Sequence, residues 1–460
     1  MATAVKKPAF GRRKDVDMTQ GSIFKHLLTF AVPLLIGNIF QQFYNMVDTW
    51  VVGNYVNDEA FAAVGTMGPI TYLLIGFFLG FSSGASVVIS QFYGAQRYDK
   101  VHDAVHTAIV MTLLLGAVFT VVGILMVPLV LKLMNTPESV VPESTEYLTI
   151  YFAGIVGLLI YNMGSGILRA IGDSKRPFYF LLVSALTNIV LDLVFVLVFN
   201  MGVGGVALAT VIAQGLSAIL VLVTLFRTSS CVRLQFTHLR LYGDMLGKIV
   251  KLGIPAALQM AITSFSNIFV QSYINYFDTY AMGGWTAYSK IDQLILLPMQ
   301  SLALASTTFV GQNLGKGNEQ RARKGVRTAL LMSMVSTVIL MIPVMIFAPQ
   351  AVWFFRREPA VIEFGTLFIR WLSPFYVLCC VNQIYAGALR GSGNTTTPMI
   401  IMLVSFVGFR QIYLYVMKNY ISNTILPIAM SYPAGWLLCS TLMLIYFNKA
   451  KLSKGRLVKD

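Results

Sequence analysis

Long apolar stretches recur along the whole chain and are separated by short polar segments. Twelve of them exceed about 20 residues, the length at which a helix rising about 1.5 Å per residue crosses about 30 Å of hydrocarbon. The pattern predicts transmembrane helices at 26–53, 61–92, 103–129, 144–168, 177–199, 203–227, 249–273, 286–310, 326–348, 363–389, 398–418 and 425–447.

The composition agrees with a bilayer environment. Of the 460 residues, 56% are hydrophobic and only 12% are charged, and the mean hydropathy is +0.71. So few polar side chains cannot coat a soluble protein of this size. We therefore expect an all-α integral membrane protein whose main partner is the lipid bilayer.

The positive charge is distributed unevenly along the chain. The net charge is +15, from 34 Lys and Arg against 19 Asp and Glu. With the N-terminus inside, 26 of the 34 basic residues fall in cytoplasmic segments, as the positive-inside rule demands, so both termini are expected in the cytoplasm. Basic residues spread along one membrane face, without interleaved aromatic residues on a single domain, argue against nucleic-acid binding.

The two halves of the chain match each other at a fixed offset of 221 residues. Gln91 and Gly94 match Gln312 and Gly315, and the loop LRAIGDSKRP at 168–177 matches LRGSGNTTTP at 389–398. Chance matches between apolar sequences would favour Leu and Val inside helices, whereas these are Gln, Gly, Arg and Pro at loop borders. The matches predict an internal duplication.

Six helices per repeat is an even number, so both halves enter the membrane in the same orientation and are related by a pseudo-two-fold axis along its normal. Two six-helix bundles flanking a cleft suit alternating access, in which one bundle rocks against the other. The expected organisation is a cytoplasmic tail at 1–25, an N-lobe at 26–227, a cytoplasmic linker at 228–248, a C-lobe at 249–447 and a cytoplasmic tail at 448–460.

Carboxylates inside the predicted helices mark a candidate ion site, because a charge at the centre of a membrane helix costs about 2.5–3.5 kcal/mol on insertion scales. Asn188 and Asp192 lie four residues apart and share one face of an otherwise apolar helix. Thr210 on the next helix reaches a similar depth. Asp48 lies on a polar stripe of the first helix, which must face protein or water.

These groups suit two kinds of chemistry. Carboxylate, amide and hydroxyl oxygens can hold Na⁺, or the two carboxyl groups can share a proton because like charges close together oppose full ionisation. The alternative is that Asp48, Asn188 and Asp192 only hydrogen-bond helices together. No resident cofactor is expected besides the coupling ion. Further candidates for this site are Gln41, Asn45, Tyr151 and Asn162.

The second half of the chain does not repeat the acidic residues of the candidate ion site. Tyr413 occupies the position that matches Asp192, and the stripe on the seventh predicted helix is neutral. Asp292 and Arg410 lie inside predicted helices of this half, where a charged side chain is costly unless it has a partner or a function. A structural pair between them and a role in substrate or proton binding are both open.

These features resemble the multidrug and toxic compound extrusion family over about residues 20–447. The shared features are Pro33 with Asp48, the loop QFYGAQR at 91–97 repeated as QNLGKGN at 312–318, and the two loops at 168–177 and 389–398. The bacterial and archaeal damage-inducible branch looks closest. This family lies within a superfamily that also contains flippases of lipid-linked oligosaccharides and polysaccharides.

The resemblance implies a V-shaped molecule that exchanges Na⁺ or H⁺ for organic cations, as a monomer in a bacterial or archaeal cytoplasmic membrane. In the closest branch, the positions of Asp48, Asn188, Asp192 and Thr210 form a cation site. Other branches carry an essential acid on the seventh helix, where this chain has Gln259 and Thr263. That departure weakens any expectation of a cation site in the C-lobe.

The sequence favours a secondary-active exporter of cationic, amphiphilic compounds. The alternative within the superfamily is a flippase or exporter of a lipid-linked precursor or endogenous metabolite, which would need a cationic cleft that Arg410 alone hardly supplies. An enzyme is not expected, because no metal-ligand cluster, nucleotide-binding loop or nucleophile constellation stands out.

Overall fold

The computed structural model describes residues 16–134, 136–422 and 424–458. Within these ranges the chain is helical, without strands. The helices are α1 Ile23–Tyr55, α2 Asp58–Gly94, α3 Tyr98–Leu133, α4 Val141–Ala170, α5 Lys175–Leu193, α6 Gly202–Arg227, α7 Gly243–Ile274, α8 Thr279–Gly315, α9 Glu319–Ile346, α10 Ala348–Phe355, α11 Pro359–Leu372, α12 Tyr376–Gly391, α13 Thr396–Met402, α14 Arg410–Val416, α15 Ile425–Ala429 and α16 Ser431–Lys449.

Twelve segments of the described chain are long and apolar enough to cross a membrane, which confirms the predicted number. α8 and α9 begin well before the predicted spans at 286–310 and 326–348, because their helical hydrogen bonding continues into polar residues beyond the apolar window. The tenth span consists of α11 and α12, joined by a 3₁₀ turn at Ser373–Phe375.

Two short π-helical segments interrupt the fifth helix of the C-terminal half, and one ends the fifth helix of the N-terminal half. They lie at Leu403–Phe409 and Met417–Ile421, on either side of α14, and at Val194–Val198, directly after α5. Such segments re-aim the side chains around them and are frequent at functional sites. Each of the two helices also carries a buried charged residue beside its π segment, Asp192 or Arg410.

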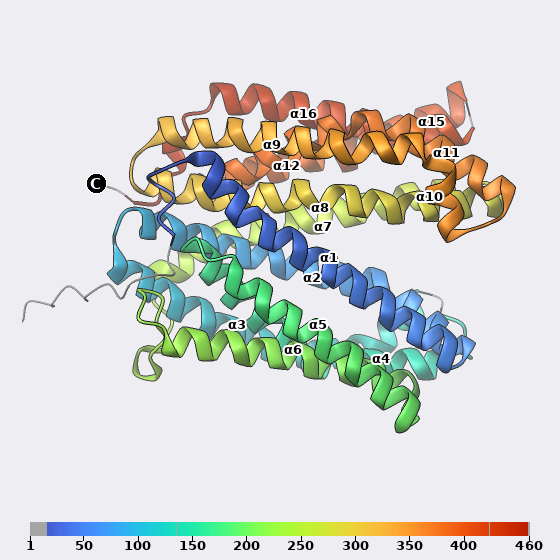
Figure 1. Ribbon diagram of the computed structural model, residues 1–460, viewed down its shortest axis with the longest axis horizontal. Coiled ribbons are helices and arrows are strands. Elements are labelled where there is room, and N and C mark those ends of the chain that lie inside the picture. The colour runs from blue at the N-terminus through green and yellow to red at the C-terminus, as the bar shows by residue number, and fades with distance from the viewer. Residues whose placement is uncertain (1–15, 135, 423, 459–460) are drawn as a thin grey trace, which may run out of the picture.

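The helices form two bundles, α1–α6 and α7–α16, that approach each other at the end of the molecule where α1 begins and α16 ends, and diverge toward the opposite end (Figure 1). The bundles therefore form a V. α2 packs against α7 through small residues, and a Cβ on Gly84 would lie 2.5 Å from the Cα of Gly253. Glycine lets two membrane helices pack backbone to backbone at this crossing.

Hydrogen bonds between the bundles hold the closed end of the V. Gln91 Nε2 on α2 donates to the carbonyl of Gly391 at 3.0 Å, and Gln312 Nε2 on α8 donates to the carbonyl of Ala170 at 2.9 Å. The offset of 221 residues relates Gln91 to Gln312 and Ala170 to Gly391. The same bond is therefore made twice, once in each direction across the pseudo-two-fold axis.

The segments that flank the first and last helices dock on the same two glutamines. Gln312 Oε1 accepts from the backbone N–H of Met18 at 3.0 Å, and Gln91 Oε1 accepts from the backbone N–H of Leu457 at 2.8 Å. Arg321 adds hydrogen bonds to the carbonyls of Met18, Gln20 and Gly21. Both glutamine side chains thus use their donor and their acceptor, as buried amides should.

The helix ends that carry these glutamines touch without intervening side chains. A Cβ on Gly94 would lie 1.9 Å from the carbonyl oxygen of Gln312, and a Cβ on Gly315 would lie 2.0 Å from that of Gln91. A backbone oxygen cannot rotate away as a side chain can. The closed end therefore requires glycine at both positions.

We expect Gly94→Ala to separate the two bundles at the closed end and to destabilise the closed form by about 1–3 kcal/mol, as overpacking does. Spin-label distances between the α2–α3 and α8–α9 loops would measure the separation. Gly215→Ala is the matched control, because nothing lies within 4 Å of its Cβ position. Equal label distances in both variants would show that this crossing does not hold the bundles together.

Candidate cation site

The structure brings together four polar side chains from α1, α5 and α6. The carboxyl groups of Asp48 and Asp192 lie within hydrogen-bonding reach of each other. Asn188 Nδ2 lies 3.5 Å from Thr210 Oγ1, and this hydroxyl donates to the carbonyl of Val206 at 3.0 Å. The four residues predicted to form one site therefore lie close together in the structure.

Local helix geometry positions these groups. Asn188 and Asp192 lie one turn apart, so they share the face of α5 that meets α6. The π segment Val194–Val198 begins two residues after Asp192. Asp48 lies seven residues before the end of α1, which is about 10 Å along the helix. The cluster therefore belongs to the half of the N-terminal bundle nearest the open end of the V (Figure 1).

The cluster is rich in oxygen atoms that lack a protein donor. Asp192 is 0% exposed and Asn188 is 2% exposed. In the part of the chain that the structure describes, no N–H or O–H donates to either Asp192 oxygen, to Asn188 Oδ1 or to Asp48 Oδ1. A buried acceptor without a donor costs about 1–3 kcal/mol, and more when it is charged. A proton or a hard cation such as Na⁺ is the kind of ligand that satisfies such a set.

Two tyrosines, Tyr44 and Tyr147, border the carboxyl groups, and Tyr151 lies beside them. The Tyr147 hydroxyl lies close enough to both acids to interact electrostatically with them, and its ring stacks on Tyr151 with the centroids 6.3 Å apart. Tyr44 interacts with Asp48 and with the side chain of Gln41. Sequence reasoning included Tyr151 and Gln41 but missed Tyr44 and Tyr147. The usable signal was helical spacing, since each lies four residues before a candidate, Asp48 or Tyr151.

Of two further predicted site residues, Asn45 lies near the acid cluster and Asn162 lies away from it. Asn45 is half-buried and lies three residues before Asp48 on α1. Asn162 lies eleven residues after Tyr151, about 16 Å further along α4. Its side chain donates to the carbonyl of Leu158 at 2.9 Å, and its carbonyl accepts from Ser82 at 2.8 Å. Asn162 therefore joins α4 to α2 and lies away from the acid cluster.

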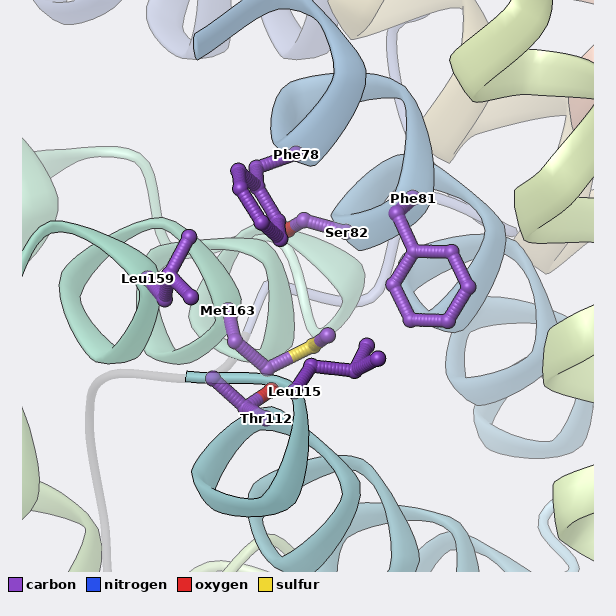
Figure 2. Close-up of a pocket in the computed structure, with 7 residues that line it drawn as sticks. All are labelled: Phe78, Phe81, Ser82, Thr112, Leu115, Leu159 and Met163. Carbon is purple, nitrogen blue, oxygen red and sulfur yellow. The ribbon is translucent and has the colours of Figure 1, made fainter. Parts of the chain in front are cut away.

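The interior of the N-terminal bundle is closely packed beside this contact. A cavity between α2, α3 and α4 is lined by side chains that include Ser82, Thr112 and Met163 (Figure 2). Its volume is about 10 Å³. That is about the minimum space for one water molecule, so this cavity does not accommodate an organic compound.

In the C-terminal bundle, Asp292 and Arg410 do not form an ion pair. Asp292 on α8 interacts with the hydroxyls of Tyr288 and Tyr376. The guanidinium of Arg410 donates to the Ser266 hydroxyl at 3.0 Å. Of the two roles left open for these residues, the direct structural pair is not formed, because Asp292 and Arg410 engage different hydroxyl groups.

Twelve membrane-spanning helices in two repeated bundles, with a pair of adjoining acids in the N-terminal bundle, define a membrane transporter of the alternating-access type. A sequence model of the MatE family matches residues 33–194 and, separately, residues 255–416. The chain belongs to this family, known in full as multidrug and toxic compound extrusion. The double match also confirms the internal duplication.

Named relatives align over nearly the whole chain. The probable multidrug resistance protein YpnP of Bacillus subtilis is 30% identical, over 85% of this chain and 88% of its own length. The probable multidrug resistance protein YoeA of the same species is 29% identical, over 92% and 93%. A solved outward-facing multidrug resistance transporter of the family is 22% identical, with a TM-score of 0.90 over 97% of this chain and 100% of that one, and shares the fold.

We expect Asp192→Asn to leave the melting temperature unchanged or to raise it by the equivalent of about 1–3 kcal/mol, because it removes one of two adjoining buried carboxyl groups while preserving their shape. Thermal unfolding in detergent measures this. The control is Asp244→Asn, which breaks an exposed ion pair with Lys248 and should change stability by less than about 1 kcal/mol. A marked loss of stability in Asp192→Asn alone would assign the acids to helix packing.

Proposed function

We propose that this protein is a secondary-active exporter that exchanges Na⁺ or H⁺ for amphiphilic organic cations. The contact between the Asp48 and Asp192 carboxyl groups carries the proposal. Two adjoining carboxyl groups in a low-dielectric bundle cannot both remain ionised without a cation between them. The occupancy of the site therefore follows the concentration of the coupling ion on the side to which it is open.

Coupling requires that ion binding favour one arrangement of the bundles over the other. Asp48 lies on α1, and both Asn188 and Asp192 lie on α5, so an ion held between them joins two helices that can otherwise move apart. Entry of Na⁺ or H⁺ from the open end draws α1 and α5 together. This change in the N-terminal bundle favours release of the organic compound on that side.

The basic residues support one orientation in the membrane. They concentrate in the segments at the closed end of the V, where α1 begins and α16 ends, and such segments face the cytoplasm. The open end then faces outward, as export requires. We place the protein in a bacterial or archaeal cytoplasmic membrane, where one chain contains both bundles and works as a monomer.

Proteoliposomes loaded with a fluorescent cationic dye provide the main test. We expect dye transport under an imposed Na⁺ gradient or an imposed pH gradient, and at least a tenfold slower rate (roughly 1.4 kcal/mol) in Asp192→Asn. Asp244→Asn should transport like the wild type. The gradient that drives the wild type identifies the coupling ion.

If Asp192→Asn transported the dye as fast as Asp244→Asn and the wild type, Asp192 would have no role in coupling. Absence of dye transport under both gradients, in a protein that melts cooperatively, would favour the alternative of a flippase or exporter of a lipid-linked precursor or endogenous metabolite. Binding of a lipid phosphate would then be the direct measurement.

Cysteine labelling tests the orientation. In a Cys231→Ser background, we introduce Thr237→Cys in the α6–α7 loop or Glu358→Cys before α11, at exposed positions at opposite ends of the molecule. A membrane-impermeant thiol reagent should label Glu358→Cys in intact cells and Thr237→Cys only after permeabilisation. The reverse pattern would invert the proposed orientation and contradict export.

A further inference from the structure

Two short segments from opposite ends of the chain dock at equivalent places on the closed end of the V. We call residues 16–21 the N-strap and residues 452–458 the C-strap. One backbone N–H of the N-strap donates to Gln312, and one backbone N–H of the C-strap donates to Gln91. The offset of 221 residues relates these two glutamines, so the straps use equivalent acceptors in different bundles.

The repeat also relates the glycines on which the straps lie. The Val16 carbonyl lies against Gly172 and the Gly455 carbonyl against Gly393, so closely that a Cβ on either glycine would collide with it. In both straps this carbonyl comes two residues before the N–H that donates to glutamine. The offset places the counterparts of 16–21 at 237–242, in the linker. The two chain ends therefore reach equivalent places without being repeats of each other.

Each strap joins one bundle to the other. In the N-strap, the N–H of Val16 donates to the carbonyl of Ile171 in the N-terminal bundle at 3.1 Å, and Met18 is fully buried in the hydrophobic core of the C-terminal bundle. In the C-strap, Gly455 lies on the C-terminal bundle, and Val458 packs into the core of the N-terminal bundle. The two straps thus connect the bundles in opposite directions.

Charged side chains of α9 hold the straps in place. Arg321 Nη2 donates to three carbonyls of the N-strap, at 2.8 to 3.2 Å. Glu319 accepts from the N–H groups of Leu452 and Ser453 in the C-strap, at 3.1 and 3.2 Å. Such charge-assisted bonds are strong, but none belongs to a membrane-spanning helix. A strap can therefore leave its site without breaking a helix.

The straps are too short to stay docked when the closed end opens. Alternating access separates the bundles at this end, which moves Gly172 away from Gln312 and Gly393 away from Gln91. Two residues of extended chain span at most about 7 Å, and each strap has only two residues between its glycine and its glutamine contact. Each strap must then give up one of its two contacts.

We propose that the N-strap and the C-strap are a pair of releasable locks that hold this end closed, and that each detaches from one bundle whenever the end opens. The inference rests on alternating access by the two bundles, and on neither the coupling ion nor the exported compound. Because the straps dock on both bundles only in the closed arrangement, weaker docking increases the population of the other arrangement.

Spin-label distances across the closed end test the lock. In a Cys231→Ser background, labels at Asp99→Cys on α3 and Gln320→Cys on α9 occupy exposed positions in different bundles. We expect Arg321→Gln, and separately Gly455→Ala, to raise the ratio of long to short distances about tenfold. The first removes the charged donor of the N-strap, and the second places a methyl group against a backbone carbonyl.

Matched controls change the same helix or the same residue type without touching a strap. Lys324→Gln removes an exposed cation of α9, and Gly247→Ala adds a methyl group where nothing lies within 4 Å. Both should keep the wild-type distances. Wild-type distances in Arg321→Gln and Gly455→Ala as well would overturn the proposal, since undocking a strap would then not affect the bundles.

A thiol in the N-strap tests whether the strap leaves when the end opens. Met18→Cys places it at a fully buried position, so a thiol reagent in detergent should label it slowly. Gly455→Ala undocks the other strap, and it should speed this labelling by the same factor as it raises the ratio of distances, because coupling is reciprocal. Gly247→Ala should not change the labelling rate.

Two results of the labelling experiment would contradict the lock. Fast labelling of Met18→Cys in the absence of a second change would mean that the N-strap is not docked in the closed form. Longer label distances in Gly455→Ala with unchanged labelling of Met18→Cys would mean that the bundles separate while the strap stays in place. Neither measurement needs dye or an ion gradient, so failure of the export assay leaves both intact.

Discussion

The two hydrogen bonds from Gln91 and Gln312 to carbonyls of the opposite bundle are the constraint on which the rest of this structure depends. They close one end of the V where Gly94 and Gly315 allow the backbones to touch. Because both bonds and both contacts are related by the repeat, the bundles meet symmetrically there. The acid cluster and Arg410 are consequently placed in bundles that are free to separate at the other end.

The duplicated halves retained their scaffold and diverged in their chemistry. The glutamines, the glycines at helix ends and the loops at 168–177 and 389–398 serve the same purpose in both halves. Asp192 and Arg410, in contrast, give corresponding helices opposite charges. A backbone contact tolerates few substitutions, because no side-chain rotation relieves it, whereas a buried side chain can be replaced when its neighbouring side chains change with it.

Sequence reasoning identified the acid cluster because charged and amide side chains are costly in hydrocarbon and helical spacing places them on a face. It did not separate Asn162 from the cluster, since polarity alone does not tell which helix a side chain joins. It also left open a pair between Asp292 and Arg410. Both are buried charges, but which neighbours they reach depends on the packing angles of α7, α8 and α12, and no periodicity records these angles.

The sequence by itself determined that this is a membrane protein of twelve helices in two repeats. Helix length, apolar composition and the duplication can all be read from the order of residues along the chain. Only the tertiary structure decided that Asp48 contacts Asp192, that Tyr44 and Tyr147 border them, and that Arg410 lies between Phe406 and Tyr432. These contacts join residues far apart in the chain, and they depend on how helices cross, which is set by side-chain packing in three dimensions.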